Sequence, residues 1–144
     1  MVNNTQELIE TLKSQHRKIQ SDLRAAYDEL KSEGETPSSA IVADLSRFKK
    51  DLEEHLKLES EEFYPDYLAK KEARGEDTDS AKKFIRMMDD IGEVVMAFLY
   101  KYSTEEAVEN SRDTFEDELL EIIDTLNTRI ETEEQGVYDI YLLS

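Results

Sequence analysis

The chain contains no cysteine, and only four of its 144 residues are glycine and two are proline. The absence of cysteine excludes disulfide bonds, thiolate metal ligands and a cysteine nucleophile. With so few glycines and prolines, the chain has few residues that interrupt helices or form tight turns. Its composition, 38% hydrophobic and 37% charged residues, favours long helices over β-sheet. We therefore predict an all-α fold in one domain, residues 1–144, because this length is ordinary for a single domain.

The chain is also poor in basic residues and in long apolar runs. Its 18 lysines and arginines stand against 35 acids, which gives a net charge of −17. Such a surface repels nucleic acid and anionic membranes. No run approaches the ~18 apolar residues of a membrane span, and the N-terminus lacks the basic-then-apolar order of a signal peptide. We expect a cytoplasmic protein that binds neither nucleic acid nor membranes.

Four apolar patterns with helical period predict four helices. Within each pattern the apolar residues recur in steps of three and four, and polar stretches separate the patterns. Residues 70–80 are the longest of these polar stretches and are predicted to be a connection. Because short connections make successive helices antiparallel, we predict an up-down-up-down four-helix bundle. The helices are predicted near Asn4–Ser32, Pro37–Leu68, Ser80–Tyr102 and Arg112–Leu142.

Four polar residues fall on the inward stripes of these predicted helices. They are His16, His55, Glu59 and Glu133, and they include both histidines of the chain. At ~1.5 Å of rise per residue, the antiparallel arrangement places them at one height, within ~20 Å of one end of the bundle. Tyr64, Tyr67, Tyr138 and Tyr141 are predicted to close that end.

Buried carboxylates need a compensating charge, and imidazole with carboxylate is a metal-ligand set. A divalent cation would balance the two glutamates. A metal-free arrangement is the alternative: Arg129, one turn before Glu133, pairs with Glu59 and Glu133 while the histidines complete the hydrogen bonds. In that case the protein is a four-helix interaction module without metal chemistry.

Three segments carry a resemblance to a known family. They are Gln15–Ile19, His55–Glu59 followed by Phe63-Tyr64-Pro65, and a weaker copy of the second, Arg129–Glu133 followed by Val137-Tyr138. With these segments the chain resembles hemerythrin-like proteins of the HHE cation-binding family. The resemblance implies an up-down four-helix bundle that holds two irons, bridged by two carboxylates and an oxo or hydroxo group. It also implies reversible binding of dioxygen, or sensing of oxygen, iron or nitric oxide.

The chain departs from the family pattern in one half of the site. The family has a histidine on helix 1, a histidine and bridging glutamate on helix 2, two histidines on helix 3, and a histidine and bridging carboxylate on helix 4. In this chain the predicted third helix has no histidine, and Met88, which we interpret as core, falls near one missing position. Arg129 stands at the fourth-helix histidine position. The positions that match are His16, His55, Glu59 and Glu133.

This pattern of losses predicts one iron rather than two, with zinc or no metal as alternatives. Asp89 and Glu93 flank the stripe of the third helix and are the candidates for a replacement ligand. Dioxygen or nitric oxide is the expected small-molecule partner, and the sequence identifies no protein partner. No set of residues that would position a substrate stands beside the site, so we do not expect an enzyme.

Overall fold

The computed structural model describes residues 4–32 and 38–143, and these ranges contain helices and no strand. Two π-helical turns, η1 (Glu59–Phe63) and η2 (Glu133–Val137), interrupt two of the long helices. The predicted all-α fold is confirmed. The α-helices are α1 (Asn4–Lys31), α2 (Ser38–Leu58), α3 (Tyr64–Ala73), α4 (Asp79–Lys101), α5 (Glu105–Asn110), α6 (Arg112–Thr132) and α7 (Tyr138–Leu142).

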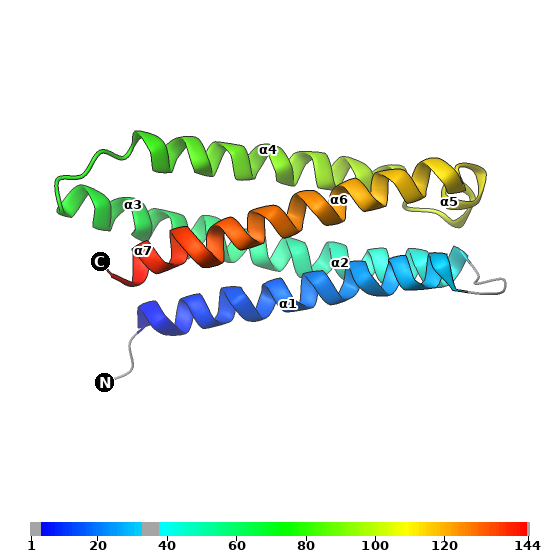
Figure 1. The fold of residues 1–144 in the computed structure, drawn as a ribbon, viewed down its shortest axis with the longest axis horizontal. Helices are drawn as coiled ribbons and strands as arrows, with labels where there is room; N and C mark the ends of the chain where they lie inside the picture. Colours follow the sequence, from blue (N-terminus) through cyan, green and yellow to red (C-terminus); the bar gives the residue numbers. More distant parts are fainter. Residues whose placement is uncertain (1–3, 33–37, 144) are drawn as a thin grey trace.

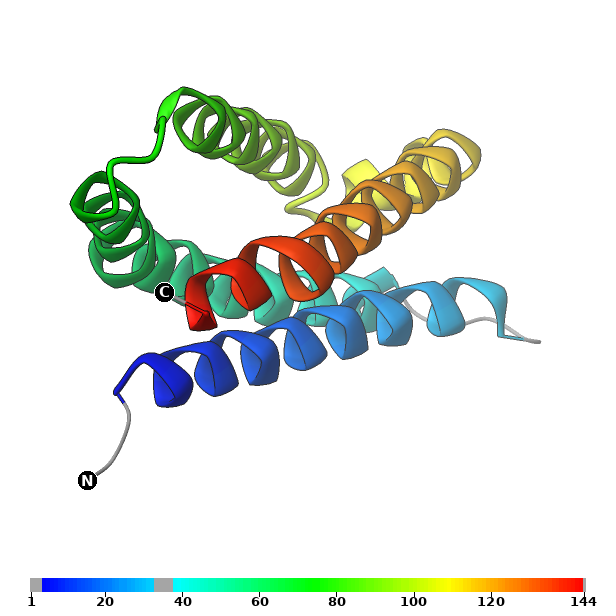
Figure 2. The same ribbon diagram turned by 60° about the vertical axis from the view of Figure 1, so that its left-hand side comes forward.

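Four antiparallel rods make up the bundle: α1, α2 continued by η1 and α3, α4, and α6 continued by η2 and α7 (Figure 1). The short helix α5 lies between α4 and α6, and α1 begins at the same end of the bundle as α7 ends. Seen from the side, α4 lies against α2 and α6 and diagonally opposite α1 (Figure 2). The predicted up-down-up-down topology is confirmed.

Most helix ends agree with the sequence, and the second rod is the exception. Its predicted start, Pro37, lies outside the described residues. Its end is five residues later than predicted, at Ala73 instead of Leu68, so only residues 74–78 of the polar stretch form the connection. The last turn of α3 is polar, so its helical period is invisible in an apolar pattern. Gly75, with φ of 73°, ends the helix in the left-handed conformation that glycine adopts without strain.

The apolar core is divided into two parts. The larger part lies toward the end of the bundle that carries α5 and includes Phe48, Phe98 and Phe115. The smaller part lies at the opposite end, where Phe63 packs edge-on against Tyr138 and Tyr141, with ring centroids 5.2 and 5.0 Å away. Tyr64 and Tyr67 belong to the same cluster, so the predicted closure of this end by tyrosines is confirmed. None of the helices in the described ranges is long and apolar enough to cross a membrane.

Candidate metal centre

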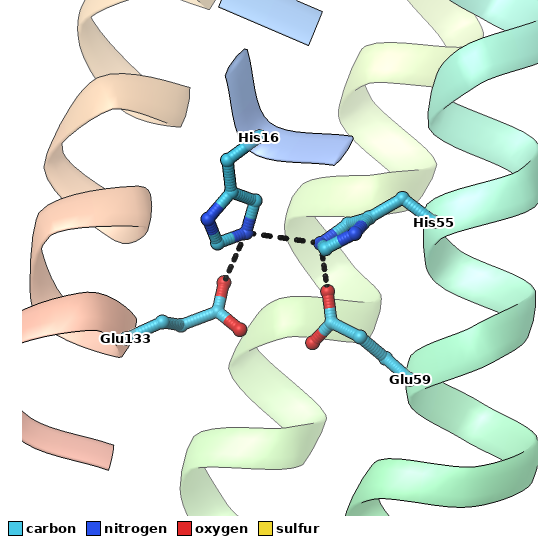
Figure 3. Close-up of side chains that lie close together, drawn as sticks. All are labelled: His16, His55, Glu59 and Glu133. Carbon is cyan, nitrogen blue, oxygen red and sulfur yellow. Dashed lines mark hydrogen bonds and ion pairs between the residues drawn. The ribbon is translucent and has the colours of Figure 1, made fainter. Parts of the chain in front are cut away.

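The four polar residues singled out in the sequence converge between the two parts of the core (Figure 3). His16 comes from α1, His55 from the end of α2, and the two glutamates from the first positions of η1 and η2. One nitrogen or oxygen atom from each lies within 4.8 Å of those of the other three. All four side chains are buried, with relative exposures of 0% for His16 and Glu59, 4% for His55 and 1% for Glu133.

The contacts within this group are short. The Nε2 atoms of His16 and His55 are 3.1 Å apart, and His16 Nε2 lies 3.8 Å from Glu133 Oε1. His55 Nε2 lies in direct contact with Glu59 Oε1. The Tyr138 hydroxyl, 3.4 Å from His16 Nε2, donates its hydrogen bond to Glu133 Oε2 at 3.1 Å. The centre is therefore a compact, buried cluster of two imidazole nitrogens and two carboxylates.

Each glutamate opens a π turn. The backbone N–H of Tyr64 bonds to the carbonyl of Glu59, and that of Tyr138 bonds to the carbonyl of Glu133, five residues earlier in both cases. Turns of this kind are rare and occur frequently at functional sites. These turns explain why the segment ending at Tyr138 resembles the one ending at Tyr64. In each, the wider turn brings both a glutamate and the tyrosine five residues later to the interior.

A second set of hydrogen bonds orients the two imidazoles. His16 Nδ1 lies 2.7 Å from Glu134 Oε2, and His55 Nδ1 lies 2.8 Å from Gln15 Oε1. An oxygen acceptor at Nδ1 holds the ring proton there and leaves the Nε2 lone pair free to bind a metal. With both ring protons on Nδ1, the two Nε2 lone pairs face each other across 3.1 Å. That separation suits two ligands of one ion, because metal–imidazole bonds are ~2.0–2.1 Å long.

Sequence reasoning missed Gln15 and Glu134. Each is the chain neighbour of a predicted ligand, Gln15 before His16 and Glu134 after Glu133. Neighbours on a regular α-helix point ~100° apart, so helical periodicity alone does not bring both members of such a pair to one site. The only available signal was their position next to a ligand.

Burial decides the charge of His16. Removal from water, followed by the repulsion of His55, lowers its pKa to about 4, although the nearby glutamates oppose the change. His16 is therefore neutral at pH 7, which is the form that binds a metal.

The two buried glutamates need a compensating cation or proton. Burial raises the pKa of Glu133 well above its usual range, and the charge of Glu59 raises it further. Burial also acts to raise the pKa of Glu59, but contact with His55 outweighs it and holds that pKa below its usual value. Apart from the contact between Oε1 and His55 Nε2, the oxygens of Glu59 accept no hydrogen bond of good geometry from the described residues. Buried carboxylate oxygens without donors are costly unless a positive ion compensates them, so the residues present fit a metal.

Comparison with known families supports this interpretation. A model described as the hemerythrin HHE cation binding domain matches residues 7–141. The chain belongs to this hemerythrin family. Neither the curated proteins nor the solved structures include a match to the chain.

This hemerythrin domain lacks inward ligands on α4. Asp89 and Glu93 are both exposed, so neither replaces the missing histidines. Met88 is buried among apolar side chains, as predicted for a core residue. Arg129 is half-buried, and within the described ranges it makes no ion pair with Glu59 or Glu133. The pairing on which the metal-free alternative depends is therefore not formed in this part of the chain.

A small cavity adjoins the four residues of the hemerythrin site. The centre of a water-sized sphere can occupy about 20 Å³ of it. About 10–15 Å³ by this measure holds one water molecule, so there is space for one small molecule. Besides the four residues, it is lined by residues of α1, α2, α4 and α6: Ile19, Leu52, Leu56, Met88, Ile91, Gly92, Val95, Leu126, Arg129 and Ile130.

Proposed function

We propose that this hemerythrin domain binds one divalent metal ion, iron in preference to zinc, through His16, His55, Glu59 and Glu133. The observation that carries the proposal is the pair of Nε2 atoms 3.1 Å apart, each with its Nδ1 held by an oxygen acceptor. Two imidazoles, which bind a metal through an unprotonated ring nitrogen, and two buried carboxylates supply the ligands and the charge that a divalent cation needs.

Charge and ligand supply both favour one ion over two. The two glutamates together balance one divalent cation. A second ion would need ligands from α4, where the acidic candidates Asp89 and Glu93 are exposed and no histidine exists. The positively charged Arg129, beside the cavity, would repel it further.

The donor set favours iron because two histidines with carboxylates and open positions are typical of non-haem Fe(II) sites, whereas zinc accepts the same atoms without redox chemistry. When bound, iron supplies an open coordination position for a diatomic molecule. The adjacent cavity provides space for such a molecule, which supports a role in binding or sensing dioxygen or nitric oxide. We propose a binding function of this kind and no enzymatic turnover.

The first experiment measures metal content. Untagged protein from iron-rich medium, and protein loaded anaerobically with Fe(II), are analysed for iron and zinc. We expect about one iron per chain in the wild type and none in His55→Ala. The matched control is Glu54→Ala, which removes an exposed side chain one position earlier and should retain the iron. Wild-type protein without metal would instead support the interaction module.

The second experiment tests the small ligand. Nitric oxide is added anaerobically to the Fe(II)-loaded protein, and electron paramagnetic resonance measures the iron–nitrosyl signal. We expect one nitrosyl per iron. A loaded protein that gives no such signal would contradict the binding role while leaving the metal site intact.

A further inference from the structure

The second residue of η2, Glu134, links the buried histidine of α1 to the surface. Its Oε2 atom lies 2.7 Å from His16 Nδ1 and also contacts Nη2 of Arg17. The side-chain exposure rises along this series, from 0% for His16 through 20% for Glu134 to 59% for Arg17. A charged hydrogen-bonded path of three residues thus runs from the metal-facing ring to solvent.

The other histidine has no such path. His55 Nδ1 meets the neutral side-chain oxygen of Gln15, 2.8 Å away. The position in η1 that corresponds to Glu134 is Ser60, and its side chain is exposed. The two halves of the internal copy therefore differ: one imidazole has an anionic outer partner that is itself paired with a cation, and the other has an uncharged partner.

We propose that Glu134 is a positioning residue that fixes the His16 ring and, through its charge, sets the reduction potential of the bound iron, with Arg17 moderating this effect. The proposal rests on the proposed function, since it requires iron at the four residues. An anionic acceptor at Nδ1 draws the ring proton toward itself and makes Nε2 a stronger donor. A stronger donor favours the ferric over the ferrous state. Arg17 binds the same oxygen and withdraws electron density from it, so it weakens the effect.

A purely structural role predicts something different. The Arg17–Glu134 contact also joins α1 to η2. If it served only to hold these two elements together, loss of either partner would weaken their packing, and would change the site, in the same way. The electronic role instead predicts opposite effects. Loss of the Glu134 charge makes His16 a weaker donor, whereas loss of Arg17 makes it a stronger one.

The test uses the full chain loaded with iron and compares Glu134→Gln with Arg17→Met, two changes that nearly conserve volume. Midpoint potentials are measured by spectroelectrochemistry, and circular dichroism checks the fold. We expect Glu134→Gln to weaken ferric binding by ~10-fold relative to ferrous binding, at the low end of effects seen for outer partners of metal ligands. For a one-electron couple that corresponds to a potential about 59 mV more positive. Arg17→Met should move the potential in the negative direction.

The neighbouring exposed Lys18 provides the control. Lys18→Met removes the same charge from the same helix without touching Glu134, so its shift measures the general effect of charge. Shifts of the same sign in the Glu134 and Arg17 variants, or shifts no larger than that of Lys18→Met, would overturn the proposal.

A metal-free measurement separates this proposal from the metal site itself. Nitrogen-15 NMR of the imidazoles should show His16 protonated at Nδ1 in the wild type and a mixture of ring forms in Glu134→Leu, with His55 unchanged. An unchanged His16 spectrum in that variant would overturn the positioning role. Absence of iron from the wild type would instead contradict the proposed function.

Discussion

Replacement of Glu133 by glutamine should stabilise the metal-free protein and remove its stabilisation by metal. Glu133 is 1% exposed, and burial beside Glu59 raises its pKa well above the usual 4.5. Without a metal, the folded protein must either hold a proton there or bury a second negative charge. Glutamine is neutral and similar in shape. Its carbonyl can accept the hydrogen bond of Tyr138, and its amide can donate toward Glu59 as a protonated Glu133 would.

The expected gain in the free energy of unfolding cannot exceed the cost of protonating Glu133 in the metal-free wild type. At pH 7, protonating a carboxyl whose ordinary pKa is 4.5 costs about 3 kcal/mol, at 1.36 kcal/mol per pH unit. Because folding raises the pKa of Glu133, this protonation cost grows as the pH rises above 4.5 and vanishes below it. At about 2–4 °C per kcal/mol for a chain of this size, the variant should melt up to about 10 °C higher than the metal-free wild type at pH 7.

Thermal unfolding followed by circular dichroism, with chelator and then with zinc, measures both effects. A metal at 100 times its dissociation constant stabilises the native state by about 2.7 kcal/mol, so wild type should gain from zinc and the variant should not. Glu131→Gln, an exposed site two residues earlier, removes the same charge and is the control. The reasoning is refuted if Glu133→Gln is less stable than the metal-free wild type, or if zinc stabilises it as much as it stabilises the wild type.

Three further predictions concern the rest of the bundle. Arg129→His should not create a second iron site, because α4 still offers no imidazole; elemental analysis showing two irons per chain would contradict this. At Gly92 an added methyl would lie 3.6 Å from its nearest neighbour, an ordinary contact, so Gly92→Ala should raise stability by about 0.5–1 kcal/mol. The same methyl should weaken nitric oxide binding by reducing the cavity, and unchanged affinity would exclude the cavity as the ligand's place. A hydrogen bond with the carboxyl of Asp44, together with burial, raises the pKa of Glu29 to about 7. The stability that protonated Glu29 contributes is therefore lost as pH rises from about 4.5 to 7. Glu29→Gln should flatten the stability–pH curve in that range, and a curve as steep as that of the exposed control Glu121→Gln would contradict this prediction.

The sequence was sufficient to predict the bundle and the grouping of its polar residues. The apolar stripes defined three of the four rods almost to the residue, and the antiparallel order then brought His16 level with His55 and Glu59. The second rod was predicted too short because its last turn, after Leu68, is polar and leaves no apolar signal. An apolar pattern marks only the buried face of a helix, so it does not reveal helical turns that extend beyond the core.

The outer hydrogen bonds and the π turns were not predicted, for a related reason. Gln15 and Glu134 act on histidines of other helices, and no regular period connects them to those partners. The π turns do leave a trace, which is a buried glutamate followed five residues later by a buried tyrosine. On a continuous α-helix these two positions would not share a face. The spacing from Glu59 to Tyr64, repeated from Glu133 to Tyr138, was therefore the available signal.

Anomalous scattering at the iron edge from crystals of the iron-loaded protein tests the central claim most directly. The account predicts one iron peak per chain, within bonding distance of His16, His55, Glu59 and Glu133. No peak among these residues, or a second iron beside α4, would contradict it.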